Sequence, residues 1–214
     1  MAGYPIQLEI EEMPCVVIGG GGVALRKVRS LRSAGARVTV ISPLLCEGLA
    51  ELAARGVIRH IARAYTCGDE SGYRIVICAT DDSELNRRTA KAAREGGALV
   101  NVIDAPEEGN FTVPAHLAAG PLLLTVSTGG ISPAFSRMLR CELEEAYGSV
   151  HGTFLTRLGQ WREEVKTLLP TAKERESFWR AVLTRQVMQM LREGKIKQAE
   201  ESVQDAISSI RTQS

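Results

Sequence analysis

A run of four glycines, residues 19–22, is the feature of this sequence that most directly indicates chemistry. It follows the apolar run Cys15–Ile18 and precedes residues 23–34, where apolar side chains recur at three- and four-residue spacing, as on one face of a helix. The segment Gly19–Ala24 fits the pattern G-x-G-x-x-A, whose glycines permit a tight turn and close approach of a pyrophosphate to the first helical amides. The alternative is an ordinary glycine-rich turn between a strand and a helix. The residues expected to contact a dinucleotide are Gly19, Gly21, Gly22 and Val23.

The end of the next predicted strand, Arg37–Ile41, lacks the acidic residue that often binds the ribose of a dinucleotide. The nearest acid is Glu47, which lies inside the following predicted helix. We therefore expect the Ser42 side chain and backbone groups near Pro43 and Leu44 to recognise the ribose. No arginine stands at this strand end to hold a 2′-phosphate, and this favours NAD over NADP.

A polar segment follows the fourth predicted strand, residues 74–79. In a doubly wound sheet, ligands lie beyond the carboxyl ends of the strands, so Thr80 is expected to contact the cofactor. Capping of the next helix by Asp81 or Asp82 is the alternative explanation for the polar character of this segment, and the two roles are compatible.

A second polar segment lies at the end of the fifth predicted strand, residues 98–103. Asp104 is the only acid there, and a carboxylate in this place could move a proton beside a bound substrate. Asn101 is expected to contact the same substrate. The alternative for Asp104 is a turn-forming role before Ala105 and Pro106.

Residues 127–133 combine hydroxyl side chains and glycines just before a predicted helix, a pattern that favours an anion-binding turn. Ser127 and Thr128 are the expected contacts. Arg137 and Arg140 lie three residues apart on the helix and could hold substrate carboxylates. A capped strand-to-helix connection and solvated surface arginines are the alternatives.

The elements that must position these residues alternate between short apolar strands and helices over the first hundred residues. This alternation is typical of a parallel sheet covered by helices on both faces, and right-handed crossovers make a doubly wound Rossmann sheet the simplest topology. Two further strands are predicted at Phe111–Val113 and Leu122–Val126, and the rest of the chain has helical periodicity. We predict an α/β fold with an NAD-binding Rossmann domain (1–113), followed by a middle region (114–148) and a small all-helical domain (149–214).

The composition excludes several classes of protein. With 26 basic and 25 acidic residues the formal charge is +1, so no bulk field attracts nucleic acid. No run approaches the roughly 18 apolar residues of a spanning helix, and the first residues lack the basic segment of a signal peptide. The five cysteines show no C-x-x-C spacing and the histidines do not cluster. We expect a cytoplasmic protein with no membrane contact, no nucleic-acid partner and no permanent metal site.

Six segments together resemble the precorrin-2 dehydrogenase / sirohydrochlorin ferrochelatase family, the amino-terminal module of sirohaem synthase. The ordered set is far more specific than any one motif, and the resemblance covers nearly the whole chain. The segments are residues 17–27, 79–82, 101–106, 110–115, 127–133 and 175–179.

The resemblance implies NAD-dependent oxidation of the tetrapyrrole precorrin-2 to sirohydrochlorin, with NAD as cofactor. Some members of the family also insert Fe²⁺, which would be a transient substrate. The family consists of an NAD-binding Rossmann domain, a dimerisation region and a helical domain, so the resemblance implies that residues 114–148 are the dimerisation region of a homodimer. The family's dimers are typically intertwined, and its key aspartate corresponds to Asp104. Two positions depart from the family pattern. Gly22 replaces an aspartate, and Thr128 replaces a serine that is phosphorylated in one fused branch.

Two alternatives stay open at this point. One is a dehydrogenase without chelatase activity, since the sequence does not separate the two activities. The other is an NAD-sensing regulatory Rossmann module that turns nothing over. The segments 101–106 and 127–133 argue against a sensor, because a sensor needs no second ligand site.

Overall fold

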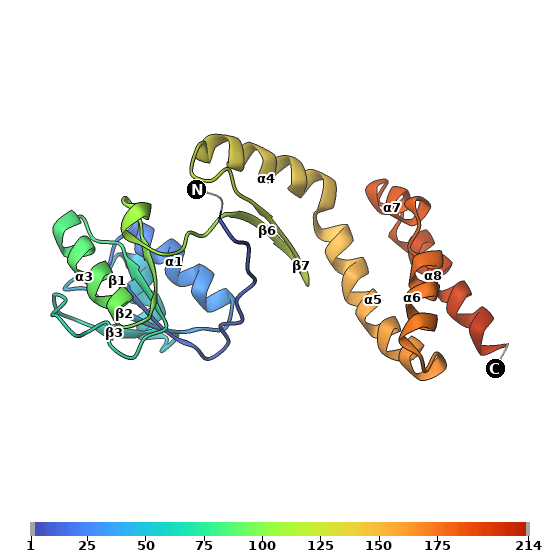
Figure 1. Cartoon of the computed structure of the whole chain (residues 1–214), viewed down its shortest axis with the longest axis horizontal. Coiled ribbons are helices and arrows are strands. Elements are labelled where there is room, and N and C mark those ends of the chain that lie inside the picture. Colours follow the sequence, from blue (N-terminus) through green and yellow to red (C-terminus); the bar gives the residue numbers. More distant parts are fainter. Residues whose placement is uncertain (1–2, 213–214) are drawn as a thin grey trace. The chain divides into compact units, whose positions relative to one another are not determined.

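The computed structural model describes residues 3–212, and its contacts divide the chain into two compact units (Figure 1). One unit spans Tyr4–Val113 and is called the first unit here; the second unit contains the residues from Pro114 onward, together with Gly3. The expected dimerisation region (114–148) and the expected helical domain (149–214) therefore belong to one unit.

The first unit is built on a five-stranded parallel sheet, as the sequence predicts, and the order of its strands is β3-β2-β1-β4-β5. The chain order reverses at β1, which pairs with β2 on one side and β4 on the other. In such sheets ligands bind where the order reverses, beyond the carboxyl ends of the strands. The strands are β1 (Pro14–Ile18), β2 (Arg37–Ile41), β3 (Arg59–Ile61), β4 (Ile75–Cys78) and β5 (Leu99–Val102).

Helices cover both faces of this sheet, and Figure 1 shows α1 and α3 on opposite sides of it. Successive strand residues point to opposite faces. Val17 therefore packs with α1 and α2, whereas Val16 packs with α3. Both side chains are fully buried, which explains why β1 is a continuous apolar run. The helices are α1 (Gly22–Ser33), α2 (Glu47–Ala54) and α3 (Ser83–Glu95).

The predicted strand at Phe111–Val113 is wrong, because these residues are in no strand. After β5 the chain makes a short 3-10 turn, η1 (Pro106–Glu108). Asn110 then binds the edge of β5: its Oδ1 accepts from the Val100 amide at 2.7 Å, and its Nδ2 donates to the Ala98 carbonyl at 3.0 Å. An amide side chain thus makes hydrogen bonds that a further strand would have made.

The second unit begins with an antiparallel hairpin that packs against α4 and α5. Its first strand, Ala115–Ala119, lies between the two further strands predicted from the sequence, where no strand is predicted. The hairpin turns at Gly120, which adopts φ +56°. The elements are β6 (Ala115–Ala119), β7 (Leu122–Val126), α4 (Pro133–Tyr147), α5 (Ser149–Leu168), α6 (Ala172–Val182), α7 (Arg185–Arg192) and α8 (Ile196–Arg211).

A separate apolar core joins α5 to α6, α7 and α8. Phe154, Trp161 and Val165 of α5 are at most 6% exposed, as their helical spacing predicts. The end of α5 is closed by Arg175, whose Nη1 donates to the carbonyls of Leu169 and Pro170 at 2.9 and 2.7 Å. The segment 175–179, which carries part of the family resemblance, therefore holds two helices together.

Candidate dinucleotide-binding and active site

The turn between β1 and α1 can only be built from glycine at its first two positions. Gly19 adopts φ +122°, and a Cβ there would lie 2.2 Å from the Ala79 carbonyl oxygen. A Cβ on Gly20 would lie 1.9 Å from the Leu44 carbonyl oxygen. Real Cβ atoms do not approach backbone this closely, so both glycines let the turn pack against the loops that follow β2 and β4.

The space around the next two glycines, Gly21 and Gly22, is open. A Cβ on Gly21 or Gly22 would meet no described atom within 4 Å, leaving out the glycine's own chain neighbours and the backbone of its helix. Gly21 is the N-cap of α1, yet no described side chain caps the helix and no acid lies in its first turn. The first amides of a helix have no acceptor inside it, so those of Gly22 and Val23 are free for an anion. These residues fit the pyrophosphate of a dinucleotide.

The start of α3 shows the contrast. Asp82 is its N-cap, and Oδ1 of this residue accepts from the amides of Glu84 and Leu85, each at 3.0 Å. A carboxylate already satisfies this helix terminus. The capping role considered for Asp82 is therefore its observed role, and of these two helix starts only that of α1 has no side-chain cap.

The loop after β2 holds the three residues predicted to recognise the ribose. The Ser42 side chain is buried, and its hydroxyl donates to the Leu44 carbonyl at 2.7 Å. The loop is tied to the glycine turn, because the Cys46 amide donates to the Gly20 carbonyl at 2.7 Å. Pro43 is exposed and the Leu44 side chain is 81% exposed, so the accessible surface here is apolar. The hydroxyl proton of Ser42 is used inside the loop, and its contact with a ribose stays a prediction.

The loop after β4 is held by a residue that the sequence analysis missed. Asn86 of α3 is 4% exposed; its Oδ1 accepts from the Thr80 hydroxyl at 2.7 Å and its Nδ2 donates to the Thr80 carbonyl at 2.9 Å. The position of Asn86 in the sequence indicates this role, because it lies one helical turn after the Asp82 cap, on the side of the helix that faces the sheet. Asn86 fixes the backbone at which Thr80 is expected to meet the cofactor.

A cavity of about 180 Å³ brings Thr80 and Asp104 together at the carboxyl ends of β4 and β5. The Asp104 side chain is exposed, and no described residue makes an ion pair or hydrogen bond with its carboxylate. An exposed, unpaired carboxylate beside a small cavity can accept a proton from a bound molecule. The other lining residues are Asp81, Ser83, Asn86, Arg87, Val102, Ala105 and Glu108.

Asn101 lies on the α1 side of the sheet and is 5% exposed. Its Nδ2 donates to the Phe111 carbonyl at 3.2 Å, whereas its Oδ1 is buried without a hydrogen-bond partner among the described residues. The structure thus places Asn101 under the segment that leaves the sheet. Its contact with substrate stays a prediction, because the side chain is covered.

The remaining predicted residues lie in the second unit. The Thr128 hydroxyl accepts from the Ser132 amide at 3.2 Å and lies 2.9 Å from the Ser136 hydroxyl, so it closes the turn before α4. Ser127 accepts from the Gly129 amide. Arg140 forms an ion pair with Glu144 at 2.6 Å.

Arg137 is the more available of the two predicted arginines. It is exposed, and no described carboxylate pairs with it. The hydroxyls of the turn are engaged in local bonds, as the alternative of a capped connection predicts. The second unit therefore offers one free guanidinium among the four residues predicted there.

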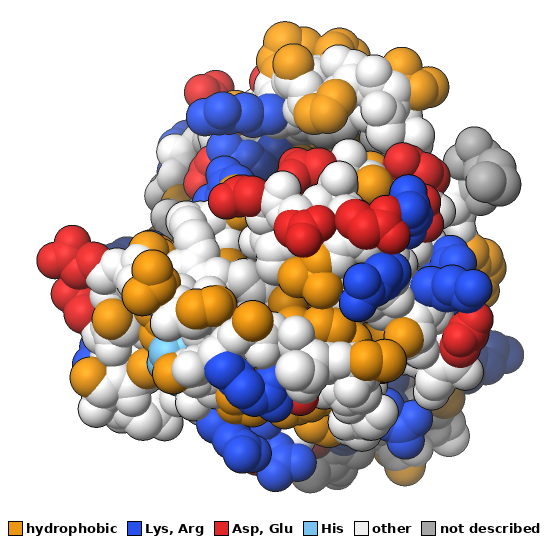
Figure 2. Space-filling view, turned by 90° about the vertical axis from the view of Figure 1, so that its left-hand side faces the viewer, with side chains coloured by type: hydrophobic (Ala, Val, Ile, Leu, Met, Phe, Trp, Pro, Cys, Tyr) orange, Lys and Arg blue, Asp and Glu red, His pale blue; other side chains and the backbone are white. Residues whose placement is uncertain are grey.

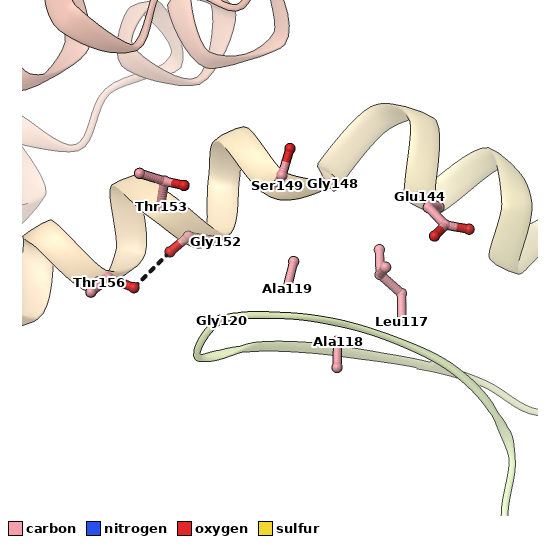
Figure 3. Close-up of a pocket in the computed structure, with 10 residues that line it drawn as sticks. All are labelled: Leu117, Ala118, Ala119, Gly120, Glu144, Gly148, Ser149, Gly152, Thr153 and Thr156. Atoms are coloured by element: carbon pink, nitrogen blue, oxygen red, sulfur yellow. Dashed lines mark hydrogen bonds between the residues drawn. The ribbon is translucent and has the colours of Figure 1, made fainter. Parts of the chain in front are cut away.

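The second unit also contains a larger hollow, of about 540 Å³, between the hairpin and the α4–α5 junction (Figure 3). The hairpin approaches α5 so closely that a Cβ on Gly152 would lie 2.2 Å from the Ala119 carbonyl oxygen. Glu144, Ser149 and Thr153 supply polar groups to its wall. None of the residues predicted to carry chemistry lines this hollow.

Three further properties of the described residues are their surface charge, their metal-binding side chains and the apolar character of their helices. Figure 2 shows acidic and basic side chains interspersed on the face that it presents. No cluster of three or more metal-binding side chains occurs between residues 3 and 212. In the same range, no helix has the length and apolar character needed to cross a membrane.

Comparison with known proteins gives three consecutive family matches. A model described as putative NAD(P)-binding matches residues 6–115, which is just over half of the chain. A model of the sirohaem biosynthesis protein central region matches residues 120–146. A model of the sirohaem synthase dimerisation region matches residues 151–207, in the part that the sequence analysis assigns to a helical domain. Where the chain forms a dimer contact therefore stays a prediction.

Two similar proteins are both siroheme synthases. The siroheme synthase of Thioalkalivibrio sulfidiphilus is 38% identical over 204 residues, which are 95% of this chain and 42% of that protein. The siroheme synthase of Methylobacillus flagellatus is 38% identical over 208 residues, which are 97% and 44%. The chain thus spans less than half the length of these relatives. Its fold matches that of SirC, a precorrin-2 dehydrogenase, with a TM-score of 0.76 and 23% identity over 93% of this chain and all of the other.

Proposed function

The chain belongs to the precorrin-2 dehydrogenase / sirohydrochlorin ferrochelatase family, and from this premise we propose that it oxidises precorrin-2 to sirohydrochlorin with NAD⁺. One observation carries the proposal. The α1 terminus is uncapped and open beside Gly21, and the same edge of the sheet holds the cavity of Thr80 and Asp104. The proposed dinucleotide site and the proposed proton-transfer site therefore follow neighbouring strands, β1 and β4.

The first unit holds the cofactor through backbone groups. The free amides of Gly22 and Val23 bind the pyrophosphate, and Thr80, fixed by Asn86, contacts the half of the dinucleotide that lies over β4. When bound, NAD⁺ supplies the acceptor for the hydride that leaves the substrate. The loop 42–46 contains no lysine or arginine, which supports NAD over NADP.

Asp104 is the proposed proton acceptor. The oxidation removes a hydride and a proton from the substrate; the hydride goes to the cofactor and the proton goes through the Asp104 carboxylate to solvent. In a further step, which not every member of the family performs, the same carboxylate would take pyrrole N–H protons as Fe²⁺ enters the macrocycle. Fe²⁺ is a substrate of that step, since it ends inside the macrocycle.

The second unit is proposed to hold the substrate's carboxylates and to form a homodimer. Arg137 is free to pair with a carboxylate, whereas Arg140 would have to leave Glu144. Ile131, Phe135 and Met138 lie along one side of the turn and α4 and are 90, 49 and 48% exposed. A continuous exposed apolar stripe next to the predicted substrate contacts supports a second copy of the chain there.

The test is a split assay. Precorrin-2 with NAD⁺ should give NADH, measured by absorbance, together with sirohydrochlorin, and omission of NAD⁺ should abolish both. Sirohydrochlorin with Fe²⁺ and no NAD⁺ should give sirohaem only if the chelatase step is present. Binding of NAD⁺ without turnover of precorrin-2 would refute the dehydrogenase and favour a regulatory NAD-binding module.

A further inference from the structure

Lys27 differs from every other lysine of the chain. Of the six lysines, all of which lie in the described range, it alone is not exposed. No described residue forms an ion pair or hydrogen bond with its ammonium group. A half-buried cation without a counter-charge is costly, so its retention in the fold needs a reason.

The position of Lys27 on α1 defines which way it faces. Leu25 and Arg29 lie on the flank next to α2, because a Cβ on Gly48 of α2 would meet the Leu25 and Arg29 side chains at 2.7 and 3.6 Å. At about 100° per residue, Lys27 lies roughly 200° away from either. It therefore faces away from α2, over the half of the sheet formed by β4 and β5.

Within the first unit, the described helices on this face are α1 and α2, because α3 packs on the opposite face. The residues of β5 that point to the α1 side include Asn101, with its unpartnered Oδ1, and Phe111 packs there after leaving the sheet. Helical side chains generally lean toward the helix N-terminus, and the glycine turn lies at that end of α1.

The protonation state of Lys27 responds to these surroundings. Burial, and then the charge of neighbouring Arg26, lower the pKa of the Lys27 ammonium. Both causes act against the charged form, and an anion brought close to the group would act in its favour. A bound anion would thus remove a cost that is present in the unliganded chain.

We propose that Lys27 binds an anionic group of a ligand at the glycine-turn site, either the pyrophosphate of the dinucleotide or a carboxylate of the tetrapyrrole. This inference rests on the proposed function for the identity of the ligands. It assigns a residue beyond the backbone amides that the glycine pattern provides. The amides hold phosphate at the helix terminus, and Lys27 provides positive charge on the side that faces β4 and β5.

Three variants test the proposal. Lys27→Gln removes the charge, Lys27→Arg keeps it, and Lys91→Gln removes an exposed lysine from α3 as a matched control. NAD⁺ binding is measured by calorimetry, and sirohydrochlorin binding by titration of its absorbance, so neither readout needs turnover. Loss of a charged hydrogen bond costs about tenfold or more in affinity.

The two ligands separate the two sources of the anion. A tenfold rise in the Kd for NAD⁺ in Lys27→Gln identifies the pyrophosphate, and the same rise for sirohydrochlorin alone identifies a carboxylate. In either case the Kd values of Lys27→Arg and Lys91→Gln stay near those of the wild type. For the ligand that Lys27 binds, the Kd of the wild type rises more steeply with salt than the Kd of Lys27→Gln.

The opposing explanation is structural: Lys27 would stabilise the fold by contacting Asn101 or by packing along α1, and would bind no ligand. Then Lys27→Gln would lower the midpoint of thermal unfolding and leave both Kd values unchanged, and this result would overturn the proposal. If the wild-type chain binds NAD⁺ but forms no NADH from precorrin-2, the proposed dehydrogenase fails while the NAD⁺ titration still decides the role of Lys27.

Discussion

Adjacent glycines of the β1–α1 turn should respond to alanine in opposite ways. In Gly20→Ala the new Cβ would lie 1.9 Å from the Leu44 carbonyl oxygen and 2.6 Å from the Ser42 hydroxyl, so the loop after β2 must move. In Gly21→Ala the new Cβ meets no described atom within 4 Å apart from its chain neighbours, and the φ of −87° is open to alanine. The first substitution disturbs folding, and the second occupies the space left for a ligand.

The magnitudes follow from these contacts. Forcing an extra methyl group against a packed backbone costs about 1–3 kcal/mol, so Gly20→Ala should lower the unfolding midpoint of the chain by several degrees. Gly21→Ala should change stability by less than about 1 kcal/mol, the range for alanine at an N-cap. It should weaken NAD⁺ binding about tenfold to hundredfold, because the methyl group displaces phosphate from the first amides of α1.

Thermal unfolding followed by circular dichroism and calorimetric titration with NAD⁺ measure the two effects separately. Gly3→Ala is a suitable control, since a Cβ there meets no atom within 4 Å and the residue lies outside the turn. The reasoning is refuted if Gly21→Ala binds NAD⁺ as tightly as wild type. It is equally refuted if Gly20→Ala is as stable as Gly21→Ala.

Three further predictions concern the polar residues. Asp104→Asn should lower the rate of NADH formation from precorrin-2 by 10²-fold or more, the usual range for loss of a general base, while the Kd for NAD⁺ changes little. Asn86→Ala should weaken NAD⁺ binding and also lower the unfolding midpoint, because the Thr80 backbone loses its anchor; an effect on binding at unchanged stability would contradict this reasoning. Burial, and then the charge of Arg192, lower the pKa of His151 below the ordinary 6.5. The unfolded chain therefore binds more protons than the folded chain near pH 6. The fold loses stability as the pH falls through this range and keeps its full stability above it, where His151 is neutral in both states. Urea unfolding from pH 7.5 to 5.5 should therefore show falling stability, and His151→Gln should reduce the slope.

Much of the first unit could be predicted because its signals are local. β1 and β4 are buried on both faces, so each is an uninterrupted apolar run in the sequence. The glycine turn follows directly from the spacing of Gly19 and Gly21 between a strand and a helix. Asp82 also carries its capping role in its position just before α3.

The errors and omissions arise where a side chain acts on distant backbone. Asn110 satisfies the edge of β5 in place of a strand, and no periodicity in residues 111–113 reveals this. Asn86 looks like an ordinary helical residue until the fold brings it against Thr80. The hydroxyls of Ser42 and Thr128 are predicted as ligand contacts from their type, yet both are used in local turns.

Three helices begin at this edge of the sheet, and the starts of α1 and α3 differ in how they can receive an anion. Asp82 accepts hydrogen bonds from two of the first amides of α3, so a second anion there would be repelled by a carboxylate that is already bound. Gly21 leaves the amides of α1 unpaired, and Lys27 places positive charge on the same helix. This contrast supports the proposal that the phosphates of a dinucleotide lie at α1. The cavity that Thr80 and Asp104 share at the ends of β4 and β5 is where we propose the proton transfer. A ligand in the reverse orientation would place its phosphates against Asp82 and Asp104, so the two carboxylates favour the proposed orientation of the cofactor.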